Sequence, residues 1–172
     1  MELAANPPQL PTDAFDLRPA WRRDDAAIEA DAIAFWRRLA ILPAGVTPEQ
    51  RAKELAAAAY EDGRLVGVMT AAATRIDFLR ARLAMVRGAV DPEHRRSRAA
   101  FALLVYTRHL LERWSCDHPD ERLAGIGAIV ESADLAGREK EPFWPMSRMG
   151  LVGYTPEGRQ IRVSWFEDFR LD

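Results

Sequence analysis

The sequence predicts a mixed α/β fold in a single domain. Stretches with the two-residue periodicity of strands alternate with stretches of helical periodicity, and one long, largely apolar helix directly follows a strand near the middle of the chain. The 172 residues are the length of one domain, and 48% hydrophobic and 29% charged residues are ordinary for a globular protein. We expect the proline-rich residues 1–12 to form a disordered or extended lead-in to a domain over 13–172.

The first half of the domain is expected to hold two helices between strands. Residues 15–18 alternate between apolar and polar and should form a short strand, and helical periodicity follows over 26–42. Thr47 is the predicted N-cap of a second, short helix, because proline follows it and glutamine lies three residues on. Residues 56–60 and 65–74 should then pair as strands around an Asp-Gly turn.

The second half is expected to continue with strands around the long helix. Residues 82–90 should form a strand that an Asp-Pro pair ends. Residues 97–114 should form the long helix, which we expect to be largely buried because apolar residues cover most of its circumference. A buried strand over 123–130, a weakly helical stretch over 133–141 and a final hairpin over 151–166 complete the order.

Composition and charge argue against several classes of protein. The net charge of −2 gives no basic field for nucleic acid, so we expect no nucleic-acid partner. No apolar run is long enough to cross a membrane and the first residues lack the pattern of a signal peptide, so we expect no membrane partner and a cytoplasmic location. The single cysteine, Cys116, rules out an internal disulfide, and we expect it to be a residue at a helix end, in the polar turn over 115–120 that looks like a connector. The histidine spacing predicts no metal site.

The turn that leads into the long helix is the strongest candidate for a functional site. Four basic or potentially basic side chains gather there: His94, Arg95, Arg96 and Arg98. The first turn of a helix has free N–H groups and the positive end of the helix dipole, which together bind phosphate. The positive end of the helix dipole repels basic groups, and the basic groups repel one another, so an acidic ligand would stabilise this otherwise unfavourable arrangement. The alternative is a solvated basic turn that is paired with surface acids such as Glu93.

This strand, turn and helix resemble the coenzyme A motif of the GNAT acyltransferase superfamily, in which a strand leads into Arg/Gln-x-x-Gly-x-Gly/Ala and a helix. Arg95, Arg98 and Ala100 fall on its three defined positions, and Leu103 falls on the apolar position that follows. The order of elements over about 15–166 is similar as well. The resemblance implies an α/β (α+β) GNAT-type acyl-CoA N-acyltransferase fold, with a central mixed sheet flanked by helices. The motif is degenerate, because Arg98 stands where the family usually has glycine.

The resemblance also implies a co-substrate, acetyl-CoA or another acyl-CoA, and an acceptor that is a small-molecule or protein amine. Backbone N–H groups of 96–100 would hold the pyrophosphate, the strand before the turn would pair with the pantetheine arm, and the strands flanking the long helix would splay apart to admit the thioester. The residues expected at the cofactor are Gly88, Ala89, Val90, Arg95, Arg96, Ser97, Arg98, Ala99 and Ala100.

The catalytic groups are less clearly marked. Glu131 is our candidate for the base that deprotonates the amine, because it lies at the mouth of the buried strand; the alternative is a surface glutamate that begins a turn. Ser132 and Glu93 are weaker candidates. Many GNAT enzymes have a tyrosine as general acid after the fifth strand, but the corresponding position here is Met146, and Tyr154, the nearest tyrosine, falls on an expected strand.

The leading hypothesis is therefore acetyl transfer from acetyl-CoA to an amine by direct attack. Two alternatives stay open: a GNAT-like domain that has lost catalysis and serves binding or assembly, and an acyltransferase that uses a longer acyl group or a different acyl carrier. Phe35, Trp36 and Tyr60 line either the acceptor side or the core. The final hairpin, with Trp165 and Phe166, provides an edge through which a homodimer could form.

Overall fold

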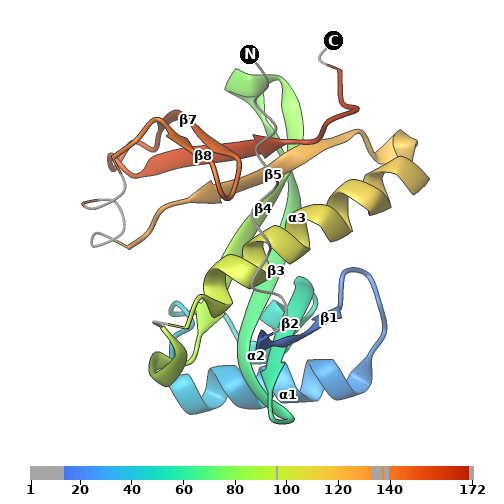
Figure 1. The fold of residues 1–172 in the computed structure, drawn as a ribbon, viewed down its shortest axis with the longest axis vertical. Coiled ribbons are helices and arrows are strands. Elements are labelled where there is room, and N and C mark those ends of the chain that lie inside the picture. Colours follow the sequence, from blue (N-terminus) through green and yellow to red (C-terminus); the bar gives the residue numbers. More distant parts are fainter. Residues whose placement is uncertain (1–13, 96, 133–136, 138–139, 171–172) are drawn as a thin grey trace, which may run out of the picture.

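The computed structural model describes residues 14–170 apart from 96, 133–136 and 138–139 (Figure 1). The main elements are, in chain order, β1 (Asp16–Pro19), α1 (Ala26–Leu39), α2 (Pro48–Ala52), β2 (Leu55–Glu61), β3 (Arg64–Ile76), β4 (Ala81–Val90), α3 (Ala99–Asp117), β5 (Leu123–Ile129), β6 (Phe143–Trp144), β7 (Met149–Tyr154) and β8 (Gln160–Trp165). The predicted lead-in and most of the weakly helical stretch over 133–141 lie outside the described residues.

The strands form one mixed sheet in the order β1-β2-β3-β4-β5-β8-β7-β6. Neighbours pair antiparallel except β4 and β5, which are parallel and are joined through α3. The sheet is strongly twisted: in Figure 1, the long strands β3 and β4 run across the direction of β5 and β8. The predicted mixed α/β architecture is confirmed.

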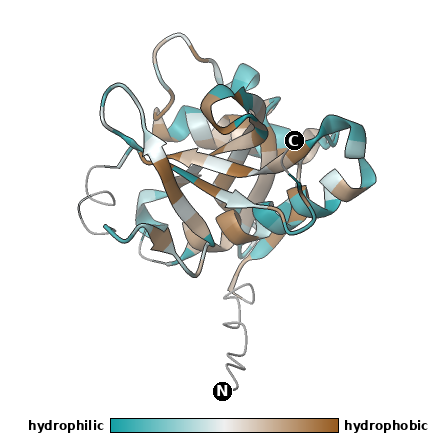
Figure 2. Cartoon of the chain, turned by 90° about the horizontal axis from the view of Figure 1, so that it is seen from above, coloured by the Kyte–Doolittle hydropathy of each residue, from teal (hydrophilic) through white to brown (hydrophobic). Residues whose placement is uncertain are grey.

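Helices α1 and α3 cover opposite faces of the sheet. In β2, Ala57 and Ala59 belong to the core under α3, whereas Ala58 and Tyr60 belong to the core under α1. This alternation follows from the period of two of a strand, and the near-continuous apolar run of β2 reflects burial on both of its faces. In Figure 2, hydrophobic colours predominate on the strands and hydrophilic colours on the loops. The core therefore lies in two layers, one on each side of the sheet.

Local signals set the ends of the first two helices. Asp25 caps α1 by accepting backbone N–H bonds, and Thr47 forms the predicted capping box with Gln50 at α2. Helix α1 ends at Leu39, three residues before the predicted end at 42, because Ala40 adopts a left-handed conformation with φ of 50°. Helix α2 has only 5 residues, as expected for the short second helix.

The long helix differs from the prediction at its ends. Helix α3 extends to Asp117, beyond the expected end at 114, so Cys116 lies at the helix end and the connector begins only after it. Residues 143–149 form the strand β6, a turn at 145–148 and the first residue of β7. The final hairpin is confirmed as β7 and β8.

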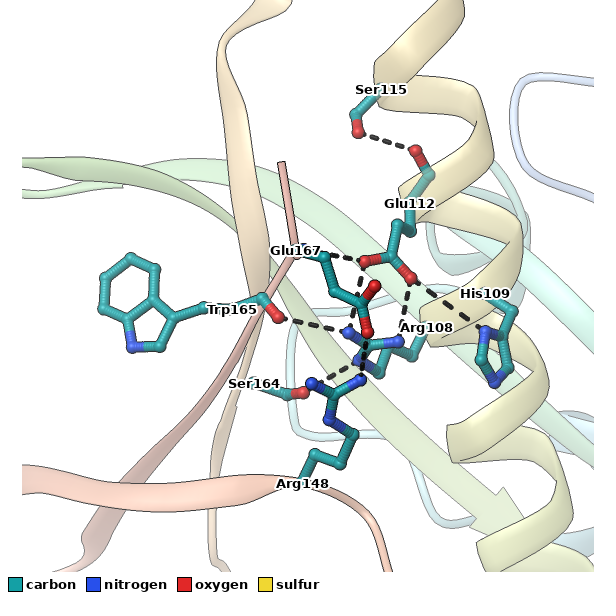
Figure 3. A network of polar contacts seen from close by, with 8 residues as sticks. All are labelled: Arg108, His109, Glu112, Ser115, Arg148, Ser164, Trp165 and Glu167. Atoms are coloured by element: carbon teal, nitrogen blue, oxygen red, sulfur yellow. Dashed lines mark hydrogen bonds and ion pairs between the residues drawn. The ribbon is translucent and has the colours of Figure 1, made fainter. Parts of the chain in front are cut away.

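A buried arginine fixes α3 to β8 (Figure 3). Arg108 makes four hydrogen bonds: its Nε donates to Ser164 Oγ at 2.9 Å, Nη1 and Nη2 donate to the Glu112 carboxylate, and Nη2 also donates to the Trp165 carbonyl. Glu112 in turn accepts from the backbone N–H of Glu167 at 2.9 Å. Because the guanidinium charge is paired and well bonded, we assign this network to positioning the sheet against the helix.

Candidate functional site

Strands β4 and β5 diverge at the centre of the sheet. Their pairing ends at Met85 and Gly127, and beyond this point β4 stays paired only with β3 and β5 only with β8. Among the described residues, 86–90 therefore have a paired strand on one side alone, that of β3. A strand that is unpaired along one edge can accept an extended partner through main-chain hydrogen bonds. The expected splay of the strands that flank the long helix is confirmed, and we refer to the space between 86–90 and 128–131 as the opening.

The N-terminus of α3 lies just beyond the end of β4. Its N-cap residue, Arg98, makes no side-chain capping bond, and the N–H of Ala102 makes the first helical bond, to the Arg98 carbonyl at 2.9 Å. The N–H groups of Ala99 and Ala100 consequently have no acceptor within the helix. Ala100 is exposed and has only a methyl side chain, so its backbone is accessible.

Arg98 adopts the left-handed conformation, with φ of 65° and ψ of 6°. This is the position at which the family motif usually has glycine, the one residue that adopts such a conformation without steric cost. For an arginine the conformation costs about 1–2 kcal/mol. The side chain itself is exposed, so the substitution leaves the backbone path of the turn in place and adds a charge beside it.

The basic turn is not neutralised by its neighbours. Arg95 and Arg98 are exposed and form no ion pair with any residue that the structure describes. Glu93, the acid considered as their partner, is 3.5 Å from Arg64 instead. Arg96 lies outside the described residues. Uncompensated positive charge at a helix N-terminus is the arrangement that an anionic ligand stabilises.

His94 does not contribute to this exposed charge. Its Nε2 lies 2.7 Å from Glu61 Oε2, at the end of β2, and its carbonyl accepts the Ser97 hydroxyl at 2.6 Å. The sequence predicts that His94 adds to the basic charge of the turn, whereas in the structure His94 holds the turn against β2. Ser97, one of the predicted cofactor residues, donates both its hydroxyl and its backbone N–H to the His94 carbonyl, and Ala99 is buried, so Ala100 is the exposed residue in the first turn of α3.

Asp91 anchors the same turn to the rest of the molecule. Its carboxylate, 2% exposed, accepts bonds from Arg38 of α1 at 2.8 Å, Arg64 of β3 at 3.1 Å and the Glu93 N–H at 3.1 Å. Burial by itself would raise the pKa of this carboxyl, but the Glu93 N–H and the two arginines outweigh burial and hold the pKa below its usual value. The sequence marked Asp91 only as a strand breaker, since its partners are distant along the chain.

The predicted cofactor residues that the structure describes fall on two consecutive segments. Residues 88–90 lie on the part of β4 that borders the opening, and residues 95 and 97–100 lie in the turn and at the start of α3. Between them run Asp91 and a short 3₁₀ turn, Pro92–His94. An unpaired strand edge is thus followed directly by an uncapped helix N-terminus.

Glu131 lies at the opening, two residues beyond the end of β5. Its carboxylate is 3.9 Å from the Nε of Arg87 on β4, and both side chains are 59% exposed. Tyr154 is exposed on β7, and Met146, at the position of the family's tyrosine, is exposed in the turn after β6. Phe35, Trp36 and Tyr60 are buried in the core under α1, and the Tyr60 hydroxyl donates to Asp31.

Other features of the described residues give no competing site. A cavity of about 330 Å³ lies at the opposite end of α3, beside Cys116 and Phe166, and is remote from the opening. No three His, Cys, Asp or Glu side chains in the described part of the chain gather as metal ligands do. None of the described helices is both long and apolar enough to cross a membrane.

Comparison with solved structures finds the same fold in GNAT-family acetyltransferases. A GNAT-family acetyltransferase from Streptococcus pneumoniae matches 88% of this chain and 99% of its own, with a TM-score of 0.59 and 12% identity. Phosphinothricin acetyltransferase from Sinorhizobium meliloti, solved with acetyl-CoA, matches 92% of each chain with a TM-score of 0.60 and 14% identity.

The ribosomal-protein-S18-alanine N-acetyltransferase of Escherichia coli matches 91% of this chain and 99% of its own, with a TM-score of 0.50 and 14% identity. No protein-family model and no curated protein matches the sequence. The chain has the GNAT fold, and at these identities its chemistry has to be argued from its own residues.

Proposed function

We propose that the protein is an acyl-CoA-dependent N-acyltransferase that transfers acetyl from acetyl-CoA to an amine by direct attack. The observation that carries the proposal is the uncapped N-terminus of α3, with unpaired charges on Arg95 and Arg98, directly beside the opening between β4 and β5. The exposed first turn of α3 at Ala100 binds the pyrophosphate through its backbone, and the two guanidinium groups add charge-assisted bonds to it.

The pantetheine arm extends from the pyrophosphate along the unpaired edge of β4. Backbone groups of Gly88 to Val90 pair with its amides as a further strand would, because no strand occupies that side. This brings the thioester into the opening. Backbone N–H groups at the divergence of the strands stabilise the oxyanion that forms when the amine attacks the carbonyl.

Glu131 acts as the base in this proposal. An amine acceptor is protonated at neutral pH and has to lose a proton before or during attack, and the Glu131 carboxylate stands at the opening with 59% of its side chain exposed. Glu131→Gln should lower kcat about 10²-fold or more and leave coenzyme A affinity unchanged. Glu49→Gln is the matched control, since Glu49 is likewise exposed and pairs with an arginine, Arg37, but lies on α2 and has no assigned part in the site. Equal turnover in the two variants would remove Glu131 as the base.

A second candidate function is a binding domain with the same fold and no catalysis. The specific observation in its favour is the turn after β6, where exposed Met146 stands at the position of the family's tyrosine acid. Without a group that protonates the leaving thiolate, acyl transfer would depend on solvent for this step. Binding of coenzyme A would persist in such a protein.

The two functions are separated by acceptor-dependent release of coenzyme A. Free thiol is followed with a thiol reagent in a Cys116→Ser background, because Cys116 is exposed and would itself react. The proposal predicts thiol release that requires both acetyl-CoA and an amine from a panel of amino acids, amines and peptides. Coenzyme A binding with no release for any amine in the panel would support the binding domain.

A further inference from the structure

A pair of opposite charges spans the opening. Arg87 projects from β4 two residues beyond Met85, the last residue that pairs with β5, and its Nε lies 3.9 Å from Glu131 Oε1 on the other side. Exposed ion pairs of this kind contribute about 0–1 kcal/mol to stability. Separating the pair therefore costs little free energy, and a ligand that carries both charges can take the place of Glu131 beside Arg87 and of Arg87 beside Glu131.

The pair lies on the face of the sheet opposite α3. Met85 packs with Leu83 and Val163 and away from the core under α3, and Ala89 packs with the core under α1. Arg87 stands between Met85 and Ala89 in the alternation of β4 and shares their face. A Cβ on Gly127 would meet Met85 Sδ at 2.6 Å, so this position of β5 faces the same way. The Arg87–Glu131 pair therefore lies at the opening on one face of the sheet, and α3, the helix that would hold the cofactor, covers the other face.

The described strand positions around the pair on that face are apolar or uncharged. The strand positions of β4, β5 and β8 that share the face with Arg87 are Ala81, Leu83, Met85, Ala89, Gly125, Gly127, Ile129, Ile161, Val163 and Trp165. Thr70, the neighbour of Arg87 on β3, directs its hydroxyl to the Arg87 carbonyl at 3.3 Å. Helix α1, on the same face, packs mainly on β2 and β3 and reaches the end of β4 at Ala89 (Figure 1).

We infer, on the basis of the proposed acyltransferase function, that the acceptor is an α-amino acid with an apolar side chain, with Arg87 binding its carboxylate and Glu131 its ammonium. An acceptor amine arrives as a cation, which Glu131 attracts and Arg87 repels. A simple amine or a polyamine leaves this repulsion uncompensated, whereas an amino acid brings its own carboxylate to Arg87. Met85, Ala89 and Ile129, the partly exposed apolar positions of this face nearest the pair, receive the side chain. Arg87 is then the residue that determines the class of acceptor.

The inference is tested with L-leucine and L-leucinamide, which share a side chain and differ in that an amide replaces the carboxylate; this change also makes the leucinamide amine less basic, which by itself would favour leucinamide. The wild-type protein should have a kcat/KM at least tenfold higher for leucine. Arg87→Gln should lower kcat/KM for leucine about 10- to 100-fold, the effect of losing a charged hydrogen bond, and should leave leucinamide unchanged or improved. Arg75→Gln is the matched control, because Arg75 also belongs to an exposed ion pair of the sheet, with Asp77 at 3.4 Å. Arg75→Gln should leave kcat/KM unchanged for both leucine and leucinamide.

Binding of both probes to the coenzyme A-loaded protein, measured by calorimetry, tests the inference without turnover. Leucine should bind more tightly than leucinamide, and Arg87→Gln should abolish the difference. Equal use or equal binding of the two probes, or a preference for leucinamide as a peptide-like acceptor, overturns the inference. Acylation of amines without regard to a carboxylate would leave the acyltransferase function intact and remove this acceptor class alone.

Discussion

The backbone of Arg98 allows a sharp test of how the cofactor turn is built. Arg98 has φ of 65°, which costs a non-glycine residue about 1–2 kcal/mol. Glycine removes this strain, but its greater freedom in the unfolded chain costs about 0.4–1 kcal/mol. Arg98→Gly should consequently be about 1 kcal/mol more stable than Arg98→Ala, which retains the strain. For a domain of this length the difference corresponds to about 2–4 °C in Tm.

Comparing the two variants with each other isolates the backbone, because both lack the guanidinium, which is exposed and packs against no core. Urea unfolding with an unchanged m-value would give the difference in free energy. An alanine variant as stable as the glycine variant would refute the strained left-handed turn. Both variants should bind coenzyme A more weakly than the wild type at low salt, since each loses one charge beside the pyrophosphate; tighter binding would mean that the side chain obstructs the site.

Two further predictions concern the strands and the turn. Gly125→Ala should destabilise the protein by about 1–3 kcal/mol or more, since its Cβ would lie 2.4 Å from the Ser164 carbonyl oxygen. Gly127→Ala should destabilise it less, because its Cβ would meet the Met85 side chain, which can move. Equal losses of unfolding free energy in urea would contradict this prediction. Asp91→Asn should lose about 1–3 kcal/mol at neutral pH. The pKa of Asp91 is depressed in the folded state, so its contribution to stability is present above about pH 4 and is lost as the pH falls through the folded pKa. The difference in unfolding free energy between wild type and variant should therefore shrink in acid. A difference that stays constant with pH would contradict the assigned ion pairs.

The order of elements could be predicted from the sequence because its signals are local. The capping box at Thr47 depends on residues three apart, and the hairpin between β2 and β3 depends on adjacent Asp62 and Gly63, which both have positive φ. The long helix was recognised from its apolar residues, although its end was misplaced because polar residues 115–117 continue it. Such features need no knowledge of distant contacts.

The site could be predicted only in part, since its decisive contacts join distant segments. The motif placed Arg95 and Arg98 at the start of α3, but Glu93 resembled their partner in sequence and turned out to pair with Arg64. Asp91 is joined to Arg38 of α1, far away in the chain. The pairing of Arg87 with Glu131 depends on where β4 and β5 diverge, which is set by register within the sheet and not by local pattern.

Calorimetric titration of the protein with coenzyme A, at low and at high salt, with Arg95→Ala alongside the wild type, tests the central claim most directly. The account predicts saturable binding by the wild type that weakens as salt increases, and weaker binding with a smaller salt dependence in the variant, because one exposed charge at the pyrophosphate is gone. No binding by the wild type, or binding that neither salt nor Arg95→Ala changes, would contradict the assignment of the uncapped N-terminus of α3 as the site of the cofactor.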